Sequence, residues 1–318
     1  MLSCPWWTGA VTRSTVLRPS IRTASFATSA FSDLPRSRTR CGDLLTPSRG
    51  IRQPRGGEER YADFCRPYLF VTGDSWLSHV SAAPLHGIPL PPTFEQDLRV
   101  HLARPAGAAN PRRRGVVGRR LHVDDADIVE LAGLRVTSPA RTWLDLATRL
   151  EPVDLVIAGD HLVSCHRRSF GPWTTPRIRI DELRAYVEGL ARVPGLPLVR
   201  RSVGRLRVGV DSPPETVLRL MLEDAGLPRF DVDHPLIGPD GVAALWPDLL
   251  NEEYRVVIEY DGAHHLTPGQ QLRDMQRDAR TAESGWAQVR VNRLDLRQGQ
   301  WWVASKVERV LRRRGWRR

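Results

Sequence analysis

The stretch WPDLLNEEYRVVIEYDGAHH, residues 246–265, is the part of the sequence that indicates most clearly how the last third of the chain folds. Its centre, Val256–Ile258, is apolar and β-branched, which predicts a buried strand. The strand runs directly into Glu259 and Asp261, although burying a carboxylate without a partner costs several kcal/mol. We therefore expect these acids to lie at the exposed end of a strand or to meet positive charge there.

The segments on either side predict an α/β fold with the order helix, three strands, helix, strand, helix. The first helix, at 211–228, has apolar residues at helical spacing, and Ser212 and Glu215 have the spacing of a capping box. The remaining expected elements are two strands around a turn at 238–241, a strand at 254–262, a polar helix at 268–284, a strand at 287–292 and a helix at 300–313. Trp301 and Trp302 are expected to be core or staple residues of this last helix.

A separate α/β module is expected upstream. Ser138 and Pro139 there have the character of an N-cap and a first helical residue. The expected elements are a strand at 68–72, a helix opening near Asp74 or Ser75, a strand at 98–103, a basic hairpin or loop at 111–120, a strand and helix at 133–147 and a helix at 153–163. The expected organisation is a disordered tail at 1–32, this module at 33–165, a bridging segment at 166–210 and a second domain at 211–318.

The composition favours a polyanionic partner. The chain carries 47 Lys and Arg residues against 36 Asp and Glu, a formal net charge of +11, and Lys306 is its single lysine. Such a surplus suits DNA, and the arginines of two basic runs are candidate phosphate contacts. These are Arg112, Arg113 and Arg114 in the first run and Arg312, Arg313 and Arg314 in the second. A solvated charged face is the alternative interpretation.

The same composition speaks against several other classes of protein. No stretch approaches eighteen uninterrupted apolar residues, so we expect no membrane span. The four cysteines have no CxxC spacing, which argues against a structural zinc site and a disulfide framework. We expect a cytoplasmic protein, and the sequence leaves its oligomeric state open.

The acids around the central strand predict a metal site. If the strands carrying Asp248 and Glu259 pair, both carboxylates converge at one sheet edge, and Glu259 and Asp261 share a strand face. Oxygen ligands of this kind hold Mg²⁺ or Mn²⁺, which can activate a water to attack a phosphodiester. Asp261 is either a third ligand or the start of a turn with Gly262. Glu215 is either a further ligand or a capping residue.

The motifs SPPETVLR, PDLL, VVIEYDGAHH and DMQRDARTAESGWAQVRV resemble the Vsr-like (very-short-patch-repair-like) family of the PD-(D/E)xK nuclease superfamily. The resemblance implies a restriction-endonuclease-like fold in which Asp248 and Glu259 hold Mg²⁺ and His265 is the general acid/base. Asp261 occupies the position of the signature lysine, and Arg277 is a candidate source of positive charge in its place. The resemblance covers residues from about 212 to 314.

The upstream motifs SRGIRQP, WLSHVSAAPLHGIPLP and TSPARTWLDLA are similar to a region grouped with AbiEi-type antitoxins and found fused to such nucleases. This resemblance covers residues from about 34 to 165. Together the two resemblances imply a metal-dependent DNA endonuclease acting in DNA repair or in defence against foreign DNA. The alternative is a nuclease fold without catalysis that serves as a DNA-binding, antitoxin-like regulator, with duplex DNA and a toxin or defence-system protein as partners.

Overall fold

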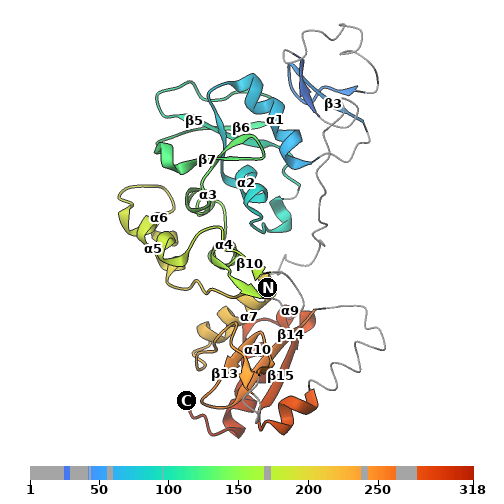
Figure 1. Cartoon of the computed structure of the whole chain (residues 1–318), viewed down its shortest axis with the longest axis vertical. Coiled ribbons are helices and arrows are strands. Elements are labelled where there is room, and N and C mark those ends of the chain that lie inside the picture. The colour runs from blue at the N-terminus through green and yellow to red at the C-terminus, as the bar shows by residue number, and fades with distance from the viewer. Residues whose placement is uncertain are drawn as a thin grey trace. The chain divides into compact units, whose positions relative to one another are not determined.

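The computed structural model describes residues 25–28, 42, 44–55, 60–94, 96–167, 173–237, 243–262 and 278–318. The chain is a mixed α/β protein, as expected, and forms two compact units (Figure 1). The N-terminal unit consists of the chain up to Glu151 together with Tyr186–Val199. The C-terminal unit contains Pro152–Ala185 and Arg200–Arg318. No helix within the described ranges has the length and apolar character needed to cross a bilayer.

A five-stranded mixed sheet with the order β6-β5-β4-β8-β7 forms the centre of the N-terminal unit. Its strands are β4 (Trp76–Leu77), β5 (Val100–Pro105), β6 (Val116–Leu121), β7 (Ile128–Leu131) and β8 (Leu134–Thr137). The pairs β5–β6 and β4–β8 are parallel, whereas β4–β5 and β7–β8 are antiparallel. A small sheet of order β1-β3-β2 accompanies it, formed by Phe26–Ala27, Ile51–Pro54 and Leu44–Leu45 respectively. Phe26–Ala27 lies in the segment expected to be a tail, most of which is outside the described residues.

The helices of this unit are α1 (Tyr61–Thr72), α2 (His79–Ala82), α3 (Pro139–Leu146) and the 3₁₀ turns Ala83–His86, Pro92–Phe94 and Asp125–Asp127. The sequence predicts the start of α3 correctly, because the Ser138 side chain accepts the backbone N–H of Arg141. Further along, the chain passes from the C-terminal unit into the N-terminal unit within α5 (Ile180–Gly189). It returns to the C-terminal unit within α6 (Leu196–Val203).

The C-terminal unit is built on a sheet of order β13-β14-β15. Its strands are β13 (Leu249–Asn251), β14 (Val256–Asp261) and β15 (Ala287–Asn292), and its helices are α4 (Pro152–Val163), α7 (Pro213–Asp224), α9 (Arg293–Gln298) and α10 (Gln300–Arg313). Two short hairpins pair β9 (His166–Arg167) with β10 (Trp173–Thr174) and β11 (Leu236–Ile237) with β12 (Ala243–Leu245). Residues 278–283 are helical. The predicted order of elements is present with two differences: four strands, β11 to β14, stand where three were expected, and α9 precedes the predicted last helix.

The core of the C-terminal unit joins α4, α7, α10 and the central strands. It includes Ile157, Leu218, Ile258, Val291 and Val307, each at most 2% exposed. Burying apolar surface of this extent is the main force that holds such a unit together. The strand predicted at 254–262 is therefore central, as its apolar run indicates, and it leads out of the core at Glu259.

Two expectations about individual elements are wrong, and a third is correct only in part. The run at 68–72 is the end of α1 rather than a strand, because Cys65 and Tyr68 face the sheet at helical spacing. The residues expected to open a helix near Asp74 instead precede β4, and α2 begins at His79. The basic run at 111–120, expected as a hairpin or loop, is a loop only as far as Gly115; it then enters a strand, β6, which pairs in parallel with β5.

Candidate functional site

The predicted acids gather where β14 leaves the core. Asp248 directly precedes β13, which pairs antiparallel with β14 so that Leu249 lies opposite Ile258. One carboxylate oxygen of Asp248, Oδ2, accepts the backbone N–H of Tyr260 at 2.5 Å. Asp248 therefore lies beside the end of β14, as the pairing of the two strands predicts. This hydrogen bond also occupies one oxygen of the carboxylate that was expected to bind a metal.

Glu215 reaches the same region from the first turn of α7. Its side chain is 8% exposed, and it accepts hydrogen bonds from Ser212 Oγ at 2.7 Å and from the backbone N–H of Asp211 at 2.9 Å. Burial, and next the negative charge of Asp248, raise the pKa of Glu215 to about 8. Two carboxyl groups more than thirty residues apart in sequence thus interact across the sheet edge.

The capping-box expectation for Glu215 is half correct. Glu215 reaches back to a backbone N–H before the helix, but the donor is Asp211, one residue before the N-cap Ser212, whereas the acid of a capping box accepts from the N-cap residue itself. The Ser212 side chain does not cap the helix, and instead donates its hydroxyl hydrogen to Glu215. A protonated Glu215 is held in place by the same two donors that would hold its charged form.

Glu259 and Asp261 face a positive group on the neighbouring strand. β14 and β15 pair in parallel, which places Glu259 opposite Arg290 and Asp261 opposite Asn292. Arg290 donates from Nη2 to Asp278 Oδ1 at 2.7 Å and to Oδ2 at 2.9 Å. Burial lowers the pKa of Arg290, but the hydrogen bond to Asp278 and the charges of Asp278, Glu259 and Asp261 raise it overall.

Arg290 supplies the positive charge that was expected beside the acids at the end of β14. Arg277, the residue predicted to supply positive charge, lies outside the described residues, as does His265. The signal for Arg290 is the alternation of AQVRVN, which puts Val289 and Val291 on the buried face and Arg290 on the other. Only the parallel pairing with β14 places it beside Glu259.

A metal site at these acids stays a prediction. Within the described parts of the chain, no three or more His, Cys, Asp or Glu residues are grouped so that they could hold a metal ion. Asp248, Glu259 and Asp261 lie at one end of one hairpin, with Glu259 half-buried and Asp261 exposed. The arrangement is able to accept a proton at Glu215 and to attract a cation.

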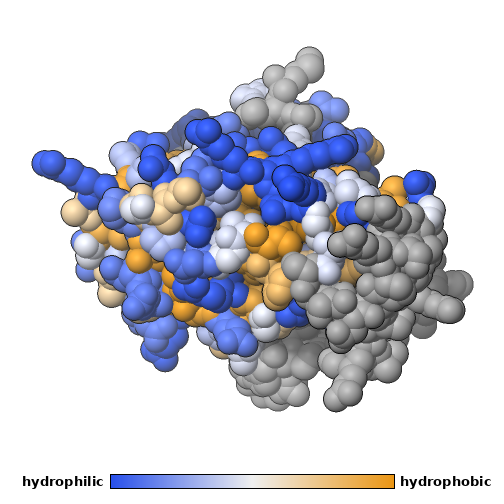
Figure 2. Space-filling view, turned by 90° about the horizontal axis from the view of Figure 1, so that it is seen from above, coloured by the Kyte–Doolittle hydropathy of each residue, from blue (hydrophilic) through white to orange (hydrophobic). Residues whose placement is uncertain are grey.

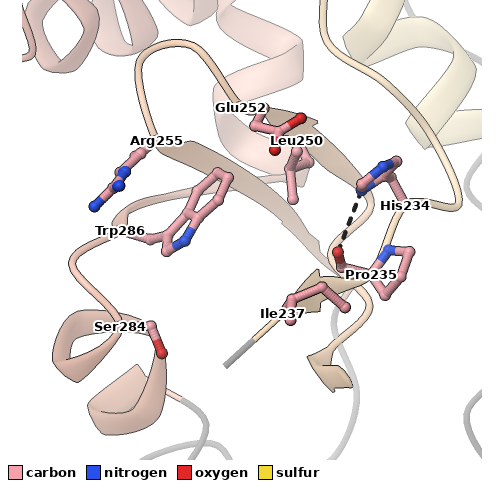
Figure 3. Close-up of a pocket in the computed structure, with 8 residues that line it drawn as sticks. All are labelled: His234, Pro235, Ile237, Leu250, Glu252, Arg255, Ser284 and Trp286. Carbon is pink, nitrogen blue, oxygen red and sulfur yellow. Dashed lines mark hydrogen bonds between the residues drawn. The ribbon is translucent and has the colours of Figure 1, made fainter. Parts of the chain in front are cut away.

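A cavity of 370 Å³ opens at the opposite end of the same hairpin (Figure 3). Glu252 and Arg255 come from the turn between β13 and β14, while Trp286 precedes β15 and His234 precedes β11. His234 Nδ1 lies 3.2 Å from the carbonyl oxygen of Pro235, the contact drawn as a dashed line. None of the acids predicted to bind metal lines this cavity, so it is separate from them.

The two basic runs differ in how far their arginines are engaged. Arg112 and Arg114 are exposed before β6, but Arg113 donates to the carbonyl oxygen of Arg49 and to Ser48 Oγ. At the end of α10, Arg313 and Arg314 are exposed. Arg312, also exposed, donates to Glu308 Oε1 at 2.7 Å and is partly neutralised. The face drawn in Figure 2 is mostly hydrophilic, with smaller hydrophobic areas between.

Trp301 and Trp302 are not core residues, contrary to expectation. Trp301 is 79% exposed and Trp302 is 46% exposed. The buried positions of α10 are Val303, Val307 and Leu311, which leave the two tryptophans toward solvent. Trp302 is held by its indole N–H, which donates to Asp295 Oδ1 at 2.8 Å.

Residues 77–162 match the family model described as AbiEi antitoxin C-terminal domain. The match begins in β4 and ends in α4, so it includes all five strands of the N-terminal sheet. It confirms the AbiEi-like expectation over these residues and does not extend to the rest of the predicted 34–165. No curated protein and no solved structure matches the chain. The Vsr-like resemblance has no counterpart among these comparisons.

Proposed function

We propose that this chain is an antitoxin-like regulator that binds duplex DNA and acts together with a toxin partner. The observation that carries the proposal is the match of residues 77–162 to the AbiEi antitoxin C-terminal domain. An antitoxin acts by opposing a toxin, so a protein whose effect this chain counteracts belongs to the proposal. DNA binding supplies the regulatory part.

The charge distribution supports DNA as the ligand. The chain has a formal net charge of +11, and Arg112, Arg114, Arg313 and Arg314 present exposed guanidinium groups. Guanidinium groups bind phosphate oxygens through two parallel hydrogen bonds and remain charged at every physiological pH. Contacts of this kind release counterions from DNA, so affinity falls as salt concentration rises. We therefore expect binding that depends steeply on ionic strength.

The proposal is tested with the full chain and a fluorescent duplex from the region upstream of its own gene. Binding is followed by anisotropy against a scrambled duplex of equal length. A regulator binds its own sequence more tightly than the scrambled one, and the ratio persists as salt rises. Growth assays with the neighbouring gene expressed alone and together with this chain test the antitoxin part, which requires toxicity that the chain relieves.

A second candidate function is metal-dependent hydrolysis of DNA. The observation that favours it is the mutual approach of Glu215 and Asp248, because the pKa of Glu215 is raised by burial and then by the charge of Asp248. A divalent cation bound between two such carboxylates removes the repulsion between them. In this account Mg²⁺ or Mn²⁺ is held by Asp248 and Glu259 with Asp261 assisting, and polarises the phosphodiester.

Plasmid cleavage in Mg²⁺ or Mn²⁺ separates the two functions. The wild-type chain is compared with an Asp248→Ala/Glu259→Ala double variant prepared in the same way. Cutting by the wild type alone, abolished by chelation, supports the nuclease. Binding without cutting by either protein supports the regulator, and equal cutting by both identifies a contaminant.

A further inference from the structure

The N-terminal unit contains a cavity of 530 Å³ that none of the sites above includes. We call it the Arg119 pocket. Its walls come from β6, α3, the start of α2 and the segment before α6. The lining side chains on which the argument rests are His79, Arg119, Arg120, Arg141 and Asp145.

Positive charge is in surplus around this pocket. Burial, and next the charge of Arg149, lower the pKa of Arg119. Arg119 Nε is buried and has no hydrogen-bond partner among the described residues. Arg141 is 7% exposed and donates from Nε to Asp145 Oδ1 at 2.9 Å. One guanidinium is thus neutralised by a carboxylate, while the other keeps a buried donor that a ligand can satisfy.

His79, which lines the pocket, and His101, whose ring is close to that of His79, are both neutral. Burial, and next the charge of Arg119, lower the pKa of His79 to about 2 and that of His101 to about 4. His101 is fully buried, its ring centroid lies 6.3 Å from that of His79, and its Nε2 lies 3.6 Å from Asp97 Oδ2. His79 has a left-handed backbone with φ of 50°, a conformation that a non-glycine residue adopts at a cost.

This cluster is not a Ser-His-Asp triad. Ser78 Oγ lies 3.1 Å from His79 Nδ1, and Asp145 Oδ2 lies 3.6 Å from the same nitrogen. A triad needs the hydroxyl and the carboxylate on different ring nitrogens, because the proton enters at one and the other is held by the acid. The groups are therefore not arranged to activate Ser78 as a nucleophile. Asp145 Oδ2 is itself buried without a hydrogen-bond partner in the described residues.

We propose that the Arg119 pocket binds a small phosphorylated molecule of the size of a nucleoside monophosphate, with its phosphate on Arg119 and a hydroxyl or amino hydrogen of the remainder on Asp145. Arg119 and Asp145 both line this cavity, and each holds a buried polar atom, Nε and Oδ2 respectively, that has no hydrogen-bond partner among the described residues. A phosphate suits the guanidinium and a hydroxyl or amino hydrogen suits the carboxylate. The volume of 530 Å³ lies in the range of small-molecule sites. This inference does not depend on DNA binding or on antitoxin activity.

Isothermal titration of the full chain with AMP, adenosine and inorganic phosphate tests the proposal. AMP is expected to bind more tightly than inorganic phosphate, since it also reaches Asp145. Adenosine, which lacks the charge, is expected to bind about tenfold more weakly than AMP or not at all. A phosphorylated oligonucleotide is included, and binding to it without binding to AMP or phosphate overturns the proposal.

Two variants and one control locate the site. Arg119→Gln is expected to weaken both AMP and inorganic phosphate by about tenfold or more. Asp145→Asn is expected to weaken AMP while changing phosphate binding little, because only the nucleoside part contacts it. Arg135→Gln removes the same charge from β8 outside the pocket and should bind like the wild type. Equal losses in Arg119→Gln and Arg135→Gln, or no AMP binding by the folded wild type, contradict the inference.

Discussion

Arg219 on α7 donates from Nη2 to Asp160 Oδ2 on α4 at 2.8 Å, with both side chains almost fully buried. The same carboxylate accepts from Thr216 Oγ1 and from the backbone N–H of Arg207, each at 2.8 Å. The AbiEi-like match ends on α4. This ion pair therefore connects the end of the matched stretch to α7, the first helix of the region predicted to be a nuclease domain. The end of the AbiEi-like match therefore shares one hydrophobic core with α7.

Asp160→Ala is expected to destabilise the C-terminal unit by about 3 kcal/mol or more, because it leaves the Arg219 guanidinium buried without this partner. Urea unfolding followed by tryptophan fluorescence measures the change. The control is Asp181→Ala, which removes an exposed ion pair with Arg184 and should change stability by less than about 1 kcal/mol. An equal loss of unfolding free energy in both variants would show that the buried pair contributes no more to stability than the exposed one.

The buried Glu215 predicts that stability falls as pH rises. Its pKa is raised from 4.5 to about 8 by burial and next by Asp248, so the folded state holds a proton that the unfolded state has lost across this window. The resulting stability is fully present below pH 4.5 and is lost as the pH rises through about 8. The slope is at most about 1.4 kcal/mol per pH unit.

Glu215→Gln should flatten this part of the pH profile, since glutamine has no proton to release. Urea unfolding at several pH values between 4.5 and 8 measures it. Glu283→Gln alters an exposed acid of the same unit and should keep the wild-type profile. Parallel profiles for wild type and Glu215→Gln would contradict the assignment.

Gly118→Ala should destabilise the N-terminal unit through a steric clash. A Cβ at this position would lie 1.9 Å from the carbonyl oxygen of Pro111 and 2.8 Å from its carbonyl carbon, which are backbone atoms. We expect a loss of about 3 kcal/mol, measured by thermal unfolding. Gly107→Ala, whose Cβ would meet nothing within 4 Å, should change stability by less than about 0.5 kcal/mol. Equal melting temperatures for Gly118→Ala and Gly107→Ala would contradict this prediction and would show that β6 shifts to avoid the clash.

The exposed arginines predict a specific change in salt dependence. Arg313→Ala/Arg314→Ala should weaken duplex binding and lower the slope of log affinity against log salt by about 0.9 for each phosphate that the variant no longer neutralises. Anisotropy at several salt concentrations gives the slope. The charge-matched control Arg66→Ala/Arg184→Ala removes two arginines outside the basic runs. An equal change in slope for both double variants would mean that net charge alone matters.

Elements with one clear periodicity were predictable from sequence. Residues 287–292 and 300–313 form β15 and α10 at the predicted bounds, because alternation and helical spacing are unambiguous there. The run at 68–72 was not, since four apolar residues in a row fit a strand as well as a helix, and only packing against the sheet decides. Trp301 was misplaced although the spacing of Val303, Val307 and Leu311 indicates the buried face.

The candidate site was predictable only as far as strand pairing allowed. The approach of Asp248 to β14 follows from the sequence on the condition that the two strands pair, which they do. The approach of Glu215 to Asp248 and of Arg290 to Glu259 depends on helix packing and on parallel register, which no local pattern contains. The Arg119 pocket combines β6, α3 and a segment from beyond residue 190, so its residues are brought together by tertiary structure alone.

The proposal that this chain binds duplex DNA as a regulator is tested best with one labelled duplex from the region upstream of the gene. The duplex is incubated with the full chain in Mg²⁺ and then examined on two gels. The account predicts that the duplex is retarded on a native gel, less so as salt rises, and remains intact on a denaturing gel. An unretarded duplex at low salt, or fragments produced by the wild type but not by Asp248→Ala/Glu259→Ala, would contradict it.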